Sequence, residues 1–129
     1  MWSFFCMRRY LRSANMSKYV TIKENRDFSR LYRKGKSFVS PVLVTYVMKN
    51  RGSELRYGIT TGKKIGNAVK RSRSRRIIRA SYYQLYPEIK QGYDLIFVAR
   101  GKTPYEKSQA ILKAMRQHLK QAGVLKTDN

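Results

Sequence analysis

The sequence is short of the residue types that carry most catalysis and metal binding in proteins. Its 129 residues include one cysteine, Cys6, and one histidine, His118, which excludes an internal disulfide and a four-ligand zinc site. Only seven residues are Asp or Glu, and they are scattered, whereas a two-metal nuclease needs clustered carboxylates. We therefore expect no catalytic side chain. His118 stands among Lys and Gln residues and is expected on the surface. The scarcity of thiols fits a reducing compartment, so the expected localisation is cytoplasmic.

Long apolar runs are also missing. No stretch approaches the ~20 residues that a membrane-spanning helix needs, so the chain is not expected to be inserted in a membrane. The N-terminal MWSFFCMRRYLRSANMS places a short apolar stretch before Arg8, Arg9 and Arg12, which reverses the order of a secretory signal. We expect residues 1–16 to be a disordered extension outside the folded domain. A basic arm for a polyanionic partner is the alternative.

Positive charge is what the chain has in excess. It holds 29 Lys and Arg residues, giving a formal net charge of +22, whereas solubility needs only about 2–8 charges on a small domain. A hydrophobic fraction of 42% with 12% aromatics is typical of a folded domain rather than of a disordered tail. Nucleic acid is the partner that best explains this charge, because neutralised phosphates release counterions. An anionic membrane surface is the second candidate.

The first periodic segment predicts a helix over residues 26–34. Asn25 precedes it as a cap, and Gly35 can end it. Phe28 and Tyr32 are four positions apart and fall on one face.

Two alternating stretches follow this helix. Residues 37–50, SFVSPVLVTYVMKN, carry apolar residues on both faces, which predicts a strand region covered on both sides with a bend at Pro41. Residues 55–60 predict a half-buried strand. It is expected to pair back as a hairpin across a turn at residues 50–53.

The C-terminal half predicts a buried strand over residues 93–100 and a helix after it. Thr103, Pro104 and Glu106 form a helix-start signal, and Gly123 can end the helix. Its apolar stripe consists of Ile111, Leu112, Met115 and Leu119.

Between these halves lies the most basic segment, residues 63–79, KKIGNAVKRSRSRRIIR, with eight cations and no acid. Residues 67–86 have helical length and contain no Gly or Pro, so they predict a helix. Arg71, Arg75 and Arg79 stand in one row at four-residue spacing. The side expected to face a sheet consists of Val69, Ile77, Ala80 and Gln84.

An arginine row of this kind has three interpretations. A solvated face normally alternates with acids, and a nuclear-localisation patch would not need a folded helix. Phosphate recognition suits the guanidinium group, whose planar fork matches phosphate oxygens. A nucleotide substrate is not expected, since the preceding GITTGKK lacks P-loop spacing and has Lys64 where Ser or Thr must stand.

The expected elements follow the order α-β-β-β-α-β-α. This is an α+β class, a small two-layer α-β sandwich. We expect a single nucleic-acid-binding domain over residues 17–123 and a flexible tail over residues 124–129.

The basic segment resembles the signature region of the bacterial ribonuclease P protein subunit. The match extends to IKENRDFSRLYRKGKSF, YGITTGKK and YDLIFVAR in the same order, and covers about Tyr19 to Leu119. The resemblance implies a protein that assists a catalytic RNA in removing the 5′ leader from precursor tRNA. It implies those two RNAs as partners, no small-molecule substrate, and Mg²⁺ required by the ribonucleoprotein without a motif in this chain. It also implies a left-handed βαβ crossover, against the usual right-handed rule.

The resemblance assigns two sets of site residues. Phe28, Tyr32 and Tyr46 match aromatics of a cleft for the leader, although plain core packing is the alternative for Phe28 and Tyr32. The set expected on the catalytic RNA is Lys63, Lys64, Asn67, Lys70, Arg71, Ser72, Arg73, Arg75, Arg76 and Arg79. Ser72 stands where the family carries Asn, so it keeps a hydroxyl but lacks the two amide donors.

Two other functions share the basic helix. A ribosomal or other structural RNA-binding protein would need the same arginines on phosphates, but it would not need the aromatic set near a sheet face. A helix-turn-helix DNA regulator is disfavoured because strands are expected on both sides of the basic helix.

Overall fold

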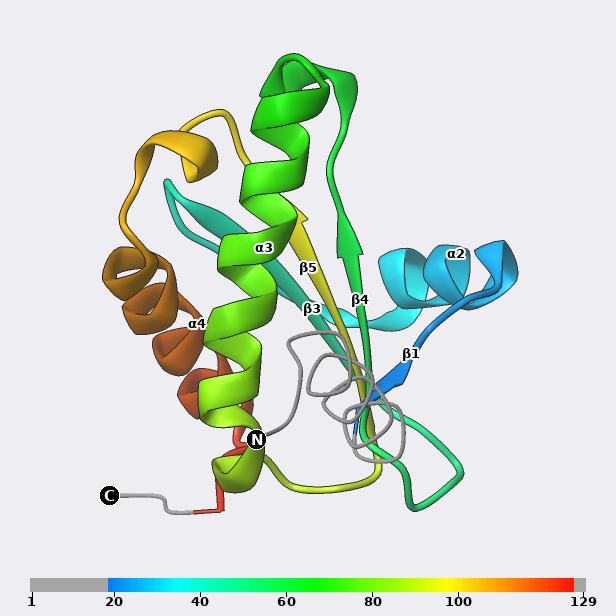
Figure 1. Cartoon of the computed structure of the whole chain (residues 1–129). Helices are drawn as coiled ribbons and strands as arrows, with labels where there is room; N and C mark the ends of the chain where they lie inside the picture. The colour runs from blue at the N-terminus through cyan, green and yellow to red at the C-terminus, as the bar shows by residue number, and fades with distance from the viewer. Residues whose placement is uncertain (1–18, 127–129) are drawn as a thin grey trace, which may run out of the picture.

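The computed structural model describes residues 19–126, and the N-terminal extension and the end of the tail lie outside this range. The regular elements are β1 (Val20–Thr21), α2 (Asn25–Lys34), β2 (Lys36–Val39), β3 (Leu43–Lys49), β4 (Arg56–Thr60), α3 (Ala68–Leu85), β5 (Tyr93–Ala99) and α4 (Ser108–Ala122) (Figure 1). Three 3₁₀ turns join them: η1 (Lys63–Ile65), η2 (Tyr86–Glu88) and η3 (Thr103–Tyr105). The predicted α+β class and element order are confirmed, and the short strand β1 is an addition.

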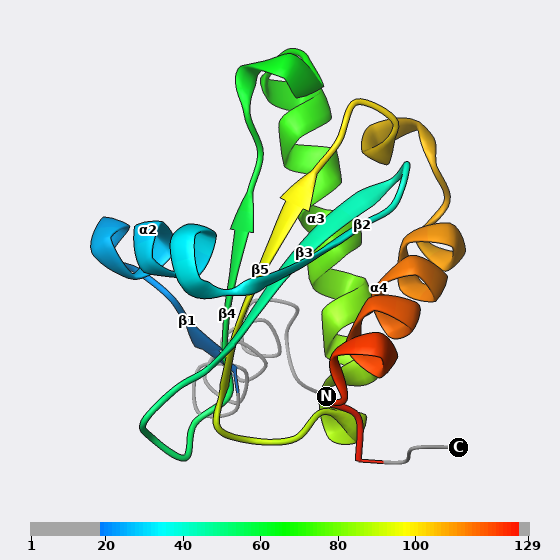
Figure 2. The same ribbon diagram turned by 180° about the vertical axis from the view of Figure 1, so that it is seen from behind.

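One five-stranded sheet organises the molecule, with the order β1-β4-β5-β3-β2. Helices α3 and α4 cover one face, and α2 lies across part of the other (Figures 1 and 2). The main core lies between α3, α4 and the sheet, and a smaller cluster around Leu31 and Ile96 lies under α2. The part of the second face that α2 leaves open is therefore available to a ligand.

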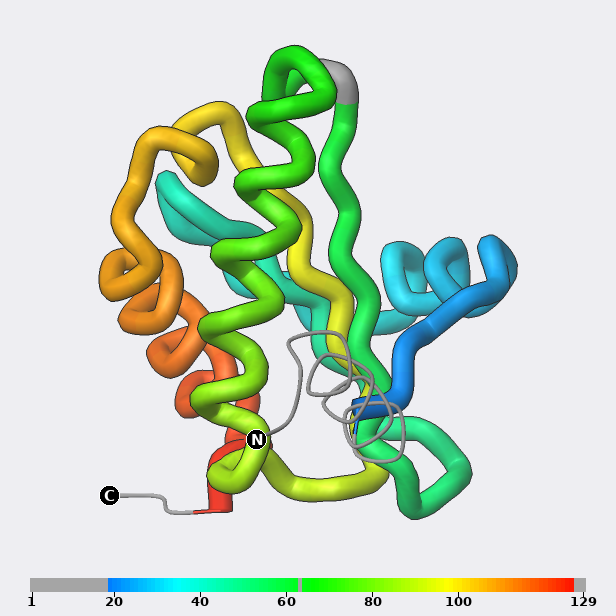
Figure 3. Tube along the Cα trace, in the orientation of Figure 1, coloured from blue at the N-terminus to red at the C-terminus, as the bar shows by residue number. Residues whose placement is uncertain are grey.

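Strands β4 and β5 are parallel neighbours joined by α3. Seen from the α3 side with both strands running upward, β5 lies to the left of β4, so the crossover is left-handed (Figure 1). The path can be followed along the chain in Figure 3. This hand is the one that the family resemblance implies, and it is opposite to the usual rule.

The hairpin predicted between residues 37–50 and 55–60 is wrong. Strand β5 is inserted between β3 and β4, antiparallel to β3 and parallel to β4. The real hairpin lies within the first stretch, where β2 and β3 pair antiparallel around Pro41. Its turn is closed by Ser40, whose hydroxyl accepts from the backbone N–H of Leu43 at 3.1 Å.

Both predicted helix starts are displaced. Helix α2 includes Asn25, and its cap position is Glu24, which makes no side-chain cap hydrogen bond. Helix α4 begins only at Ser108, and the residues from Thr103 to Tyr105 form the separate 3₁₀ turn η3. The Thr103 hydroxyl donates to the carbonyl of Val42 at 2.6 Å, which ties η3 to the β2–β3 turn.

The C-terminal end of α4 is as predicted. Gly123 adopts a left-handed φ of 75°, which a residue with a Cβ rarely adopts. The chain then continues into the core, since Val124 and Leu125 are buried and Leu125 pairs with Ile89. The packed domain thus extends past the boundary expected at residue 123.

The inward side of α3 also differs from the prediction. Val69 is 74% exposed, and Ala80 and Gln84 face solvent, while Ile77 is only half-buried. The side chains that face the sheet and α4 are Ser74, Ile78, Ser81, Tyr82 and Leu85.

The predicted surface position of His118 is wrong as well. His118 is only 4% exposed, and its Nδ1 lies 2.9 Å from the hydroxyl of Thr45 on β3. The predicted apolar stripe of α4 is confirmed, since its members Ile111, Met115 and Leu119 are buried.

Candidate nucleic-acid interface

Helix α3 is fixed at its start by Asn67. The side-chain oxygen of Asn67 accepts from the backbone N–H of Lys70 at 3.0 Å, which caps the helix. The first turn contains no acid. A helix N-terminus carries partial positive charge, so this end adds to the positive field of the side chains.

Arg71, Arg75 and Arg79 lie on the flank of α3 that faces β4. The Nη1 of Arg75 donates to the hydroxyl of Thr61 at 3.4 Å. Arg71 is half-buried, and its Nε has no hydrogen-bond partner among residues 19–126. Arg79 lies close to the hydroxyl of Tyr57. The row expected from the sequence therefore lies beside β4 and the loop that follows it.

The other predicted RNA-binding residues are spread more widely. Arg73, Arg76, Ser72 and Lys64 are exposed, and the two arginines line a groove toward α4. The side chain of Lys63 is outside what the structure describes. Within residues 19–126, no arginine of α3 takes part in an ion pair. The helix therefore presents uncompensated charge on both flanks.

The predicted cleft residues differ in exposure: Phe28 and Tyr46 are half-buried, whereas Tyr32 is exposed. Phe28 is half-buried against Gly58, where an added Cβ would lie 2.7 Å from the Phe28 ring. Tyr32 is 41% exposed, and its ring centroid lies 4.9 Å from that of Tyr46 in an edge-to-face pair. Its hydroxyl is 3.0 Å from that of Thr60. Two aromatic rings thus stand at the edge of the open sheet face.

The sheet face continues beyond α2 as an apolar floor. Val44 pairs directly with Val98 and with Val39, so the three side chains share a face with Tyr46. Val39 is 63% exposed. Figure 2 shows this part of the sheet without a covering helix.

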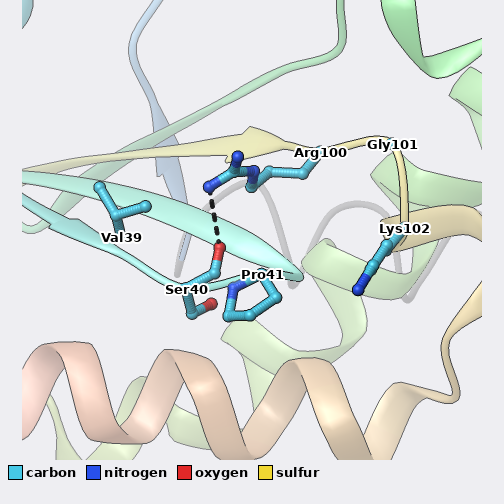
Figure 4. A pocket seen from close by; sticks show the side chains of 6 residues that line it. All are labelled: Val39, Ser40, Pro41, Arg100, Gly101 and Lys102. Carbon is cyan, nitrogen blue, oxygen red and sulfur yellow. Dashed lines mark hydrogen bonds between the residues drawn. The ribbon is translucent and has the colours of Figure 1, made fainter.

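At the far end of this floor is a notch between the β2–β3 turn and the loop after β5. Arg100 and Lys102 form one side of it, and Ser40 and Pro41 the other (Figure 4). The Nη1 of Arg100 donates to the carbonyl of Ser40 at 3.2 Å. Neither of these two cations was among the site residues predicted from the sequence. Their position directly after a buried strand places them at an end of the sheet, but the sequence does not show which face they reach.

Acidic residues serve the fold rather than a metal site. Asp94 is fully buried and accepts two hydrogen bonds from Arg56, at 2.8 and 2.6 Å, and one from Asn50 at 2.9 Å. The hydrogen bond to Asp94 raises the pKa of Arg56 above its ordinary value. No group of three His, Cys, Asp or Glu residues lies together in the described part of the chain. The described residues therefore do not fit a resident Mg²⁺ ion.

The fold and the basic helix define a small α+β nucleic-acid-binding protein. A model of the family Ribonuclease P matches residues 16–123, so the chain belongs to that family, whose members are protein components of a ribonucleoprotein. It is 42% identical over 111 residues to the ribonuclease P protein component of Clostridium novyi (strain NT), across 84% of this chain and 98% of that protein. The corresponding protein of Clostridium botulinum (strain Loch Maree / Type A3) is 40% identical over 104 residues, across 80% and 94%.

Solved structures agree with this assignment. The Staphylococcus aureus RNase P protein at 2.0 Å is 34% identical and superposes with a TM-score of 0.74, covering 83% of this chain and 98% of that one. The Thermotoga maritima RNase P protein has the same fold, with a TM-score of 0.70 at 24% identity and coverage of 78% and 96%. Nothing in these comparisons favours a ribosomal protein, and three strands separate α2 from α3, unlike a helix-turn-helix. Among the helices described, none is long and apolar enough to span a membrane.

Proposed function

We propose that this subunit of ribonuclease P binds the catalytic RNA through α3 and the 5′ leader of precursor tRNA through the Tyr32–Tyr46 cleft. The observation that carries the proposal is the charge of α3. Its arginines form no ion pair among the described residues, whereas Arg30, Arg56 and Arg116, which lie outside α3, each form an ion pair with a carboxylate. Phosphates supply the missing counter-charge, and their neutralisation releases condensed counterions.

The cleft is proposed to act by stacking. A single-stranded leader exposes its bases, and aromatic rings at the edge of an uncovered sheet face bind bases without reading their identity. Tyr32 and Tyr46 provide those rings. Arg100 and Lys102, at the other end of the apolar floor, provide charge for the leader's phosphates.

Catalysis is proposed to reside in the RNA. Mg²⁺ is a requirement of the ribonucleoprotein, which the protein meets indirectly by lowering the repulsion between RNA phosphates. The protein's contribution is then affinity and positioning, and the assembled enzyme is proposed to work in the cytoplasm.

Reconstitution tests this function. Precursor tRNA is incubated with the catalytic RNA at low Mg²⁺, with and without the protein, and with polylysine at equal charge as the control. The protein should restore accurate cleavage that the RNA alone performs poorly, and polylysine should not. If polylysine restores cleavage equally well, the protein acts only as bulk charge and the proposal fails.

A further inference from the structure

The cationic surface of α3 continues on the flank that faces α4. Arg73 and Arg76 line a groove of about 640 Å³ between α3 and the start of α4. Lys107, Ser108 and Gln109 line its opposite wall. Figure 1 shows η3 beside the upper part of α3 and the first turns of α4 beside its middle.

The groove carries a net positive charge. Its only carboxylate is that of Glu106, against the three cations Arg73, Arg76 and Lys107. Neither arginine of the groove is held in an ion pair within the part of the chain that the structure describes. The groove is therefore complementary to an anionic chain.

An exposed aromatic ring belongs to the residue that precedes Glu106 of this groove. Tyr105 of η3 is 68% exposed. The Nζ of Lys70 lies 2.5 Å from its hydroxyl and 5.0 Å from the centroid of its ring. Lys70 precedes Arg73 by three positions, so both project from the same flank of α3. A held ring beside free cations is the combination that stacks a nucleobase and binds its phosphates.

This flank is separate from the one that borders β4. Arg75 reaches Thr61 on one side, whereas Arg73 points to the α4 side. A helix with its side chains is about 10–12 Å across, so cations on its two flanks reach different stretches of backbone.

We propose that the groove between α3 and η3–α4 is a second RNA-binding surface, which takes one single-stranded segment of the catalytic RNA. Arg73, Arg76 and Lys107 bind its phosphates, and Tyr105 stacks on one of its bases. This inference rests on the proposed function and adds the η3–α4 wall to it. An acidic protein segment is the rival occupant, but the exposed ring beside the cations favours RNA.

Binding of the full chain to the catalytic RNA, measured over a range of salt concentrations, tests the groove. Lys107→Gln should lower the slope of log affinity against log salt by about 0.7–0.9. Tyr105→Ala should weaken binding about tenfold with little change in slope, and Tyr105→Phe should bind as the unmodified chain does. Lys49→Gln, the same substitution at an exposed position at the end of β3, is the matched control and should change neither quantity.

Tethered cleavage locates the bound segment. Iron–EDTA is attached at Gln109→Cys, at Thr61→Cys or at Lys49→Cys, each in a Cys6→Ser background. The probe at position 109 should cut a short RNA segment distinct from the one cut from position 61. Position 49 should give weak cleavage.

The outcomes separate the inference from the function on which it rests. If the groove variants match Lys49→Gln while Arg75→Ala still lowers the salt slope, the second surface does not exist. If probes 109 and 61 cut the same nucleotides, the inference is also overturned. Loss of cellular function without any change in RNA binding would identify an acidic protein as the occupant instead. Failure of the unmodified chain to bind the catalytic RNA would overturn the proposed function itself.

Discussion

His118 and Thr45 form a buried polar pair between α4 and β3. The histidine is flanked by polar residues in sequence, so local composition predicts an exposed side chain. Its burial depends on Thr45, which lies 73 positions away and faces α4 because β3 alternates its side chains between two faces. The ring centroid of Phe38 on β2 lies 6.3 Å from that of His118. The residues around His118 therefore come from strands that are distant in sequence, and no local pattern predicts them.

This pair predicts a pH dependence of stability. Burial lowers the pKa of His118 below its ordinary value of 6.5, so the folded protein holds the ring neutral. The unfolded chain takes up the proton at higher pH, so this contribution is complete above about pH 6.5 and is lost as pH falls below it. The loss should reach at most about 1.4 kcal/mol per pH unit.

Urea unfolding between pH 8 and pH 5 measures this effect. The free energy of unfolding of His118→Gln should be lower at pH 8, and it should fall less steeply with acidification than that of the unmodified chain. Parallel curves for the two proteins would show that His118 does not titrate on unfolding.

Tyr32 predicts a leader-specific effect. Because its ring is exposed beside Tyr46, Tyr32→Ala should weaken holoenzyme binding of leadered precursor tRNA by about 1–3 kcal/mol and leave mature tRNA unaffected. Tyr32→Phe keeps the ring and loses only the hydrogen bond to Thr60, so it should bind nearly normally. Equal weakening of both RNAs by Tyr32→Ala, or a fall in its melting temperature, would assign Tyr32 to the core.

At the scale of elements, α3 shows how small polar residues obscure a buried face. Ser74 and Ser81 are buried because each hydroxyl finds an acceptor, the carbonyls of Lys70 and Ser108 respectively. A pattern of hydrophobic residues misses such positions, since burial of a hydroxyl is tolerated wherever it is hydrogen-bonded. The prediction consequently placed the buried face on the wrong side while placing the helix itself within one residue at each end.

The arginine row of α3 predicts an electrostatic signature. Arg75→Ala should lower the slope of log affinity against log salt by about one unit and weaken binding of the catalytic RNA whatever the substrate. Arg51→Ala, in an exposed loop away from α3, is the matched control. An unchanged slope in the Arg75 variant would mean that the row is only a solvated face.

Pairing between strands was the least predictable property of the fold. The strand over residues 93–100 was recognisable from its apolar run, and the strand over 55–60 from its alternation of apolar and polar residues. Their neighbours were not, because β5 is brought between β3 and β4 only by the crossover through α3. Alternation in the sequence indicates which residues of a strand share a face. It does not indicate which distant strand pairs with that strand.

At the scale of the whole molecule, most of the described acids pair with arginines outside α3, and the arginines of α3 have no ion pair among residues 19–126. The described acids Asp27, Asp94, Glu24 and Glu88 all pair with arginines outside α3. Cations of the basic segment were predictable because they are contiguous. Arg100, Lys102 and Tyr105 were not, because only the tertiary structure brings them to the open face or to the groove.

The placement of the acids and of the one histidine predicts that the protein alone does not cleave precursor tRNA. Four of the six described carboxylates pair with arginines, the one histidine is buried, and no three His, Cys, Asp or Glu residues lie together among residues 19–126, so no cluster of described side chains is placed to hold a metal. RNA-free protein incubated with precursor tRNA and Mg²⁺ should give no accurate 5′ cleavage, whereas addition of the catalytic RNA should. Efficient cleavage that co-purifies with the protein, and is lost on alanine substitution of one of its acids, would contradict this.

The central position of β5 has a consequence for the order in which the protein is made. β5 is the last strand to be synthesised, yet it separates β3 from β4, so the sheet cannot close until residues 93–99 have left the ribosome. The arginine helix is synthesised before that. A nascent chain ending at Gly92 should therefore show no cooperative melting, whereas the complete chain should. The emerging polypeptide thus displays its phosphate-binding charge before it has a core, and any RNA within reach meets a cationic chain that has yet to fold.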